Sequence, residues 1–315
     1  MAIQLNMRPD IPPVEWDEFD ANYPPFSIAA DGFVRGPPRA SLGSRNGPKQ
    51  TLNHHEGVVS DATRCTSAQA IMAIRRGLFS CFRDEHGPRA IVWVNDCDED
   101  VCLTWFLLKH HVLCRNVMSP ALNRLIHMED MLDSTAGTYP FPLDMPILQE
   151  LAWVFEPYRQ FRQSGGLSRK IPAEYLSVVT SVEHRIMQHI MGRGDALDMD
   201  FEYKTLGGGD GWVMIKELGA QARQALFSKG IEAYVTVRER PNGRFDYVFG
   251  RISSYIPFPI PLLTARMNEL EGTPADPWGG SEIVMGSPRV AGSKLSPDQV
   301  QQAIHELLDQ NRLAA

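Results

Sequence analysis

Residues 90–111, AIVWVNDCDEDVCLTWFLLKHH, decide the predicted fold. Ala90 to Val94 is a short apolar run, which is typical of a buried parallel strand. Asp96 and Asp98 follow it, and Val101–His111 is predicted to be a helix. Ligands of open parallel sheets bind at the carboxyl ends of the strands. The order of strand, acidic loop and helix therefore predicts an α/β fold with acidic side chains at a binding edge.

The chain before this segment is expected to contribute one strand and one helix. Residues 1–50 are rich in proline and glycine, and we expect an irregular lead-in with a single short strand at Phe26–Ala30. Apolar residues recur at helical spacing in Thr66–Arg76, and Thr66 or Ser67 is the expected N-cap.

The second half is expected to hold a different kind of domain. We expect a parallel-sheet metal-binding domain over 1–145, a helical connector over 146–204 and a smaller α/β substrate domain over 205–315. The last region opens with glycines, Gly207–Gly211, which are interpreted as a turn because they match no nucleotide-binding loop. A strand, a helix and a two-stranded hairpin are expected after them.

The bulk composition limits the classes of function. The chain has 315 residues and a net charge of −7, so its surface as a whole does not attract polyanions. Its five cysteines show neither a disulfide framework nor zinc spacing, which indicates reduced thiols. Without a signal-peptide pattern or a long apolar run, we expect a cytoplasmic protein with no membrane segment.

Two groups of residues suit a metal ion. Adjacent histidines such as His54 and His55 usually point different ways, so one is expected as a ligand and the other beside the substrate. In the acidic loop, Asp96, Asp98 and Asp100 lie at i and i+2 spacing, where carboxylates share a face. Mg²⁺ and Mn²⁺ prefer oxygen ligands, and a nearby imidazole favours Mn²⁺. The alternative is a solvated acidic turn that caps the next helix.

A third group of titratable residues follows a predicted helix at 119–133. Asp130 is interpreted as a possible further metal ligand. The group consists of His110, His111, His127, Asp130 and Asp133.

The combination resembles the DHH phosphoesterase superfamily. The pair His54-His55 and the helix start at Cys65–Ala70 resemble its third motif. Asp31, at a predicted strand end, is placed like the superfamily's bridging aspartate, and Asn95–Asp98 looks like its DxD motif. The acidic segment and the apolar helix after it also resemble the MYG-type exonucleases.

The second half resembles the DHH-associated substrate domain, which ends in an arginine-serine strand and a glycine-rich, phosphate-binding loop. This resemblance implies that the substrate is bound by Arg251, Ser253, Gly279, Gly280, Ser281 and Arg289. For the two arginines, a surface charge or an interdomain salt bridge is the alternative.

The sequence also departs from the family pattern. Asn53 replaces the aspartate that names the family, and Ser281 stands where the substrate domain usually has a histidine. The DxD follows the histidine pair instead of preceding it. Either the motif order is permuted, or Asp96 and Asp98 represent the fourth motif, the first is missing and the metal centre is incomplete.

The resemblance implies a metal-dependent phosphohydrolase with two Mn²⁺ or Mg²⁺ ions. The implied ligands are Asp31, His54, Asp96, Asp98 and Asp130. His55 would hydrogen-bond the phosphate or the leaving oxygen, and Asp98 would act at the catalytic centre. The expected partner is a small phosphorylated substrate or a short single-stranded oligonucleotide, with a homodimer possible.

Two alternatives come from other classes of protein. One is a ligand-binding protein that kept the fold and lost the chemistry. The other is a mononuclear zinc hydrolase that uses His54, His55 and one carboxylate, with Glu56 as general base.

Overall fold

The apolar run 90–94 forms strand β7, as the sequence predicts, at the second position of a five-stranded sheet. The order is β1-β7-β2-β4-β3, in which the first four strands are parallel and β3 is antiparallel. The α/β class is therefore confirmed. The strands are β1 (Ile3–Met7), β2 (Ser27–Ala30), β3 (Arg39–Ser41), β4 (Lys49–Leu52) and β7 (Ala90–Val94).

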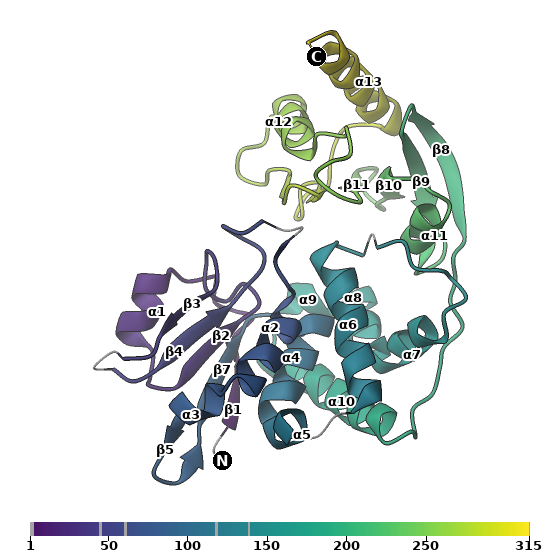
Figure 1. Cartoon of the computed structure of the whole chain (residues 1–315). Helices are drawn as coiled ribbons and strands as arrows, with labels where there is room; N and C mark the ends of the chain where they lie inside the picture. Colours follow the sequence, from purple (N-terminus) through teal and green to yellow (C-terminus); the bar gives the residue numbers. More distant parts are fainter. Residues whose placement is uncertain (1–2, 44–45, 60–61, 117–118, 138, 315) are drawn as a thin grey trace. The chain divides into compact units, whose positions relative to one another are not determined.

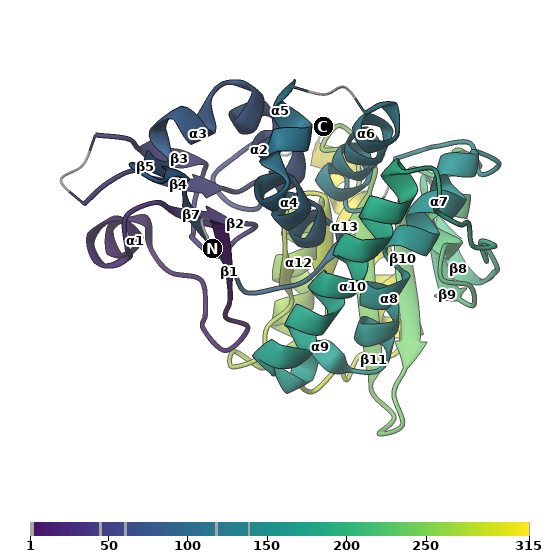
Figure 2. The ribbon, with the colours of Figure 1, turned by 90° about the horizontal axis from the view of Figure 1, so that it is seen from below.

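Helices cover both faces of this sheet. Helix α1 (Trp16–Asn22) lies on one face, and helices α2 (Thr66–Arg75) and α4 (Glu99–Lys109) lie on the other (Figures 1 and 2). Phe19 of α1 packs with Ala29 of β2 in a small buried cluster. Successive residues of each strand thus point alternately into the layer beneath α1 and the layer beneath α2 and α4.

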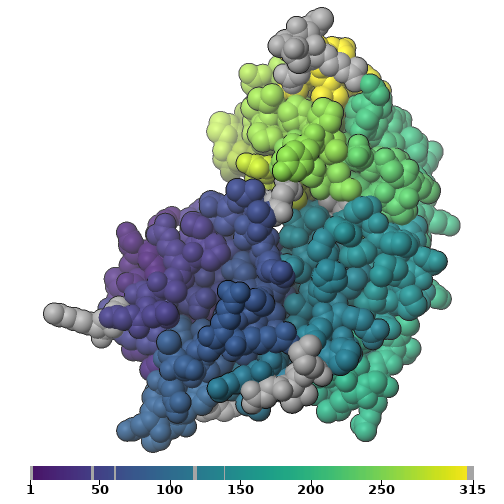
Figure 3. All heavy atoms as spheres, in the orientation of Figure 1, coloured from purple at the N-terminus to yellow at the C-terminus, as the bar shows by residue number. Residues whose placement is uncertain are grey.

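A group of helices packs behind α2 and α4. Figure 3 shows the blue atoms of the sheet and its helices directly against the teal atoms of this later helical group. Its members are α5 (His111–Asn116), α6 (Pro120–Ser134), α7 (Pro146–Val154), α8 (Glu156–Gln163), α9 (Gly166–Arg169) and α10 (Pro172–Ile190). A short helix and a hairpin precede β7: α3 (Leu78–Cys81), β5 (Arg83–Asp84) and β6 (Gly87–Pro88).

The expectation of an irregular lead-in with one strand over 1–50 is wrong. This region contributes β1, β2, β3, β4 and α1. The strands have three to five residues each, which is too short for a clear period-2 pattern, and they gain their stability from neighbouring strands.

The structure describes residues 3–43, 46–59, 62–116, 119–137 and 139–314. The chain divides into two compact units: Met1–Ser134 with Pro146–Asp198, and Thr135–Met145 with Met199–Ala315. Most of the segment expected as a connector thus packs within the first unit. No helix among the described residues combines the length and the apolar character needed to cross a membrane.

The second unit is built on a six-stranded sheet of order β12-β13-β11-β10-β9-β8. Its strands are β8 (Tyr203–Gly209), β9 (Trp212–Glu217), β10 (Ala233–Glu239), β11 (Phe245–Arg251), β12 (Gly279–Gly280) and β13 (Val284–Gly286). One hydrophobic cluster joins the sheet to α12 (Ile260–Glu271) and α13 (Pro297–Ala314), and a second joins it to α11 (Ala222–Ser228).

The expected turn at Gly207–Gly211 is correct only at its end, because Gly207 to Gly209 belong to β8. A Cβ on Gly207 would lie 1.9 Å from Oε1 of Gln301, and one on Gly209 would lie 2.9 Å from Nε2 of His305. These glycines therefore allow α13 to approach β8 closely.

Candidate metal centre

Three neighbouring parallel strands end at the same edge of the first sheet, and chemically active residues follow each of them. Asp31 directly follows β2, and His54 and His55 begin two residues after β4. Asp96 and Asp98 follow β7. Because β7, β2 and β4 are adjacent and parallel, their carboxyl ends bring these segments together.

Asp31, His54 and His55 form the first group of potential metal ligands. Oδ1 of Asp31 lies 2.8 Å from Nε2 of His55 and 3.4 Å from Nε2 of His54. The ring centroids of the two histidines are 4.2 Å apart. The two rings thus approach the same oxygen, and the expectation that they point different ways is wrong.

His54 also belongs to a second group, together with Asp100 and Asp133. Its Nε2 lies 2.9 Å from Oδ2 of Asp133 and 3.8 Å from Oδ2 of Asp100. Although the first pair is so close, neither of its two buried atoms has a hydrogen-bond partner among the described residues. The two atoms form an ion pair while His54 is protonated, and once the ring is deprotonated the same nitrogen and oxygen are placed as two ligands to one ion.

The charges at this edge alter the pKa values of its side chains. Burial lowers the pKa of His54, but the carboxylates of Asp133 and Asp31 outweigh this effect and raise it to about 11. For Asp31, burial raises the pKa, but contacts with His54 and His55 bring it well below its usual range. In the absence of a cation, a protonated His54 therefore neutralises part of the negative charge.

Other carboxyl groups hold their protons more tightly than usual. Burial, followed by the nearby charges of Asp31 and Asp96, raises the pKa of Asp98 well above its ordinary value. Burial and the charges of Asp133 and Asp31 raise the pKa of Asp100 to about 7. Crowded carboxyl groups of this kind are stabilised by a bound cation.

Three of the five expected metal ligands lie outside the two groups that the described residues form. Asp98 caps α4, where its side chain accepts a hydrogen bond from Val101 N at 2.9 Å. Asp96 accepts one from Cys97 N at 2.7 Å. Asp130 accepts hydrogen bonds from Cys65 N at 2.9 Å and from Arg64 at 3.2 Å. Their role as ligands stays a prediction.

Asp133 takes the place near His54 that sequence reasoning gave to Asp130. The two residues are three positions apart on α6 and so share a face of the helix. The i, i+3 spacing from Asp130 therefore indicated Asp133 as an alternative ligand. The sequence does not show which turn of α6 lies next to the strand ends.

Asn53, which stands where the superfamily that the sequence resembles has an aspartate, is buried. Its Nδ2 donates to the carbonyl oxygens of Val34 at 3.2 Å and Gly36 at 2.7 Å. Its Oδ1 accepts a hydrogen bond from His55 N at 3.1 Å. The amide thus fixes the loop after β2 against the histidine pair.

The predicted substrate residues of the second unit have mixed surroundings. Arg251 is buried and donates to the carbonyl oxygens of Glu282, Ser254 and Ile256, and Arg289 is exposed. Ser253 accepts a hydrogen bond from Tyr255 N.

The remaining predicted substrate residues lie beside strand β13. Gly279 and Gly280 form β12, and a Cβ on Gly280 would lie 2.1 Å from the carbonyl oxygen of Val284. Ser281 accepts hydrogen bonds from Ile283 N and Val284 N. The roles of all six residues in substrate binding stay predictions.

No protein-family model matches the sequence, and no curated protein matches it either. The case for a function therefore depends on the residues and on their geometry.

Proposed function

We propose that this chain is a metal-dependent phosphohydrolase whose centre lies at the carboxyl edge of the first sheet and binds two Mn²⁺ or Mg²⁺ ions. The observation that carries the proposal is the convergence of carboxylates from Asp31, Asp100 and Asp133 on the buried Nε2 of His54, with Asp133 Oδ2 2.9 Å from it. The ligand set combines carboxylate and imidazole groups, which suits Mn²⁺.

The potential ligands fall into two sets around His54. One imidazole nitrogen coordinates one ion, so His54 with Asp133 and Asp100 suits a first ion. Asp31 and His55 then suit a second ion. When bound, two such ions would supply Lewis acids for phosphoryl oxygens and would lower the pKa of a water molecule held there.

The protein side chains also have roles of their own. Asp31 lies between the two histidines and orients both rings through its Oδ1. His55 has a half-exposed side chain, so it is the residue of the pair that an incoming phosphate reaches first. As a ligand it would hold the second ion on the exposed side of the centre. The hydrogen bond from His55 to the phosphate that the resemblance implies stays a prediction.

A mononuclear zinc hydrolase is the second candidate, and one observation favours it. His54, His55 and Asp31 alone supply two imidazoles and one carboxylate within one group, which is a common catalytic zinc set. The oxygens of Glu56, which was expected as its general base, contact Arg35 and the backbone N of Gly36, and the role of this residue as a base stays a prediction.

Metal content and hydrolysis test the proposal together. We expect close to two Mn²⁺ per chain after reloading of the EDTA-treated protein, measured by mass spectrometry, with Mn²⁺-dependent cleavage of bis-p-nitrophenyl phosphate. Asp133→Asn and His54→Gln remove a ligand and should lower this activity at least about 100-fold. Asp17→Asn on α1 makes the same change of charge as Asp133→Asn at an exposed position and should leave activity unchanged.

The other outcomes separate the alternatives. One tightly held Zn²⁺ per chain, with activity that survives Asp133→Asn, would favour the mononuclear site. A chain that binds no metal and cleaves nothing would contradict both the two-metal and the zinc hydrolase. The remaining hypothesis would then be a ligand-binding protein without catalytic activity.

A further inference from the structure

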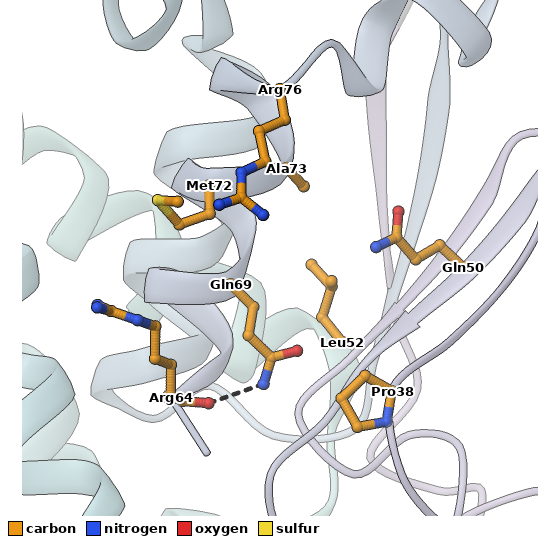
Figure 4. A pocket seen from close by; sticks show the side chains of 8 residues that line it. All are labelled: Pro38, Gln50, Leu52, Arg64, Gln69, Met72, Ala73 and Arg76. Carbon is orange, nitrogen blue, oxygen red and sulfur yellow. Dashed lines mark hydrogen bonds between the residues drawn. The ribbon is translucent and has the colours of Figure 1, made fainter. Parts of the chain in front are cut away.

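A pocket of about 360 Å³ lies in the first unit between strand β4 and helix α2. Figure 4 shows Gln50 and Leu52 of β4 on one side of it and the side chains of α2 on the other. Its volume falls within the range of small-molecule sites. None of the potential metal ligands among the described residues lines this pocket.

The charged side chains of the pocket are both cationic. Among the residues that the structure describes, Arg64 and Arg76 line it and no acidic residue does. Arg64 contacts Asp130 with one nitrogen, but 63% of its side chain is exposed. The guanidinium of Arg76 is exposed and makes no ion pair with the part of the chain that the structure describes. In a chain of net charge −7 this favours an anionic ligand.

The other residues that line the pocket suit a planar ring whose edges form hydrogen bonds. Leu52, Met72 and Ala73 supply apolar surface, and a methionine adapts to planar rings. Gln50 and Gln69 supply amides, which offer both donors and acceptors. The Nε2 of Gln69 is occupied by the carbonyl oxygens of Asn53 and Arg64, whereas its Oε1 makes no hydrogen bond within the described residues.

The pocket and the candidate metal centre are both built on strand β4 and helix α2. Leu52 precedes His54 by two residues, and its carbonyl oxygen accepts a hydrogen bond from Thr66. Thr66 also donates to Asp31 at 3.4 Å. Gln69 lies one turn further along α2 and binds the backbone of Asn53. The residues of β4 and α2 thus serve the pocket and the centre at once.

We propose that this pocket binds the part of the substrate that does not react: an anionic group attached to a planar ring with hydrogen-bonding edges. Arg76 pairs with the anion, Met72 and Leu52 contact the ring, and Gln50 binds its edge. As a substrate subsite, the pocket rests on the proposed phosphohydrolase function. Its occupancy by a ligand does not require metal.

Titration calorimetry of the full chain with AMP and with inorganic phosphate, in EDTA, tests the pocket apart from the metal centre. We expect saturable AMP binding, weakened roughly tenfold or more by Arg76→Gln because a charge-assisted contact is lost. Gln50→Leu should weaken AMP but leave phosphate unchanged. Arg83→Gln, at an exposed arginine on β5 that does not line the pocket, makes the same change of charge and should have no effect.

Two results would overturn this inference. One is the absence of AMP binding up to about 10 mM, an affinity weaker than that of ordinary sites. The other is binding that Arg76→Gln and Arg83→Gln reduce equally. Phosphate that binds as tightly as AMP would overturn the ring-binding part. A Mn²⁺ titration on the same samples reports on the proposed function separately, because the pocket can fail while the metal binds.

Discussion

At the scale of single residues, Asn53 stands where the superfamily that the sequence resembles has an aspartate, and its amide makes hydrogen bonds that an aspartate cannot make. An aspartate there would place its charge against two carbonyl oxygens, those of Val34 and Gly36, which the amide now satisfies. The asparagine is therefore required by the local hydrogen bonds. Its presence is compatible with a working metal centre, because Asp133 supplies a carboxylate beside His54 from another helix.

Asn53→Asp tests this interpretation. We expect it to destabilise the protein by about 2–3 kcal/mol at pH 8, because two buried acceptors lose their donor and face a negative charge. Urea unfolding in EDTA measures the change, with Asn22→Asp at the exposed end of α1 as the control. A variant as stable as the wild type that binds Mn²⁺ more tightly would instead identify position 53 as a ligand position.

At the scale of elements, the start of helix α2 depends on carboxylates from other helices. Its N-cap is Cys65, which provides no side-chain cap, so the expectation of Thr66 or Ser67 is wrong. Asp100 of α4 accepts hydrogen bonds from Thr66 N at 2.6 Å and from Ser67 N at 2.7 Å, and Asp130 of α6 accepts one from Cys65 N. These carboxylates satisfy backbone groups that a helix leaves open at its first turn.

Asp100→Ala should therefore disrupt the first turn of α2. We expect a loss of about 2–4 kcal/mol in EDTA at pH 8.5, above the pKa of Asp100 of about 7, since two backbone donors then lose a charged acceptor. Asp98→Ala, which removes only the cap of α4, should cost about 1 kcal/mol. Hydrogen exchange should accelerate at Thr66 and Ser67 in the first variant and not in the second. Equal losses from both variants would argue against this role of Asp100.

The same elements show how far the sequence could be interpreted alone. The run 90–94 is apolar, long enough and followed by acidic residues, so β7 and the acidic residues at its carboxyl end were predictable. The pairing of short strands and the reach of Asp133 and Asp100 depend on contacts between distant segments. Such contacts leave no periodic signal in the sequence.

At the scale of the whole molecule, the potential ligands are distributed over one unit of the chain. They come from residues 31, 54, 55, 100 and 133, all within Met1–Ser134. A metal that binds them links β2, β4, α4 and α6, so it stabilises the folded form of that unit by mass action. The two groups share His54, so the protonation of this residue governs how metal binding depends on pH.

Metal binding should release protons. The pKa of His54 is raised from 6.5 to about 11, so in the metal-free protein its ring is protonated at neutral pH. The contribution of this proton to folding stability is full below about pH 6.5, declines as pH rises and is gone above about pH 11. A metal binds only the deprotonated ring of His54 and must therefore displace this proton. Asp100 has a pKa of about 7, so below that pH a metal that binds its carboxylate displaces a second proton. We therefore expect Mn²⁺ affinity to increase from pH 6 to pH 9, with roughly one proton or more released per chain. Calorimetry in buffers of different ionisation enthalpy measures this number, and His54→Gln should reduce it while Asp17→Asn should not. Mn²⁺ that binds without releasing protons would show that the ion occupies a site that does not include His54.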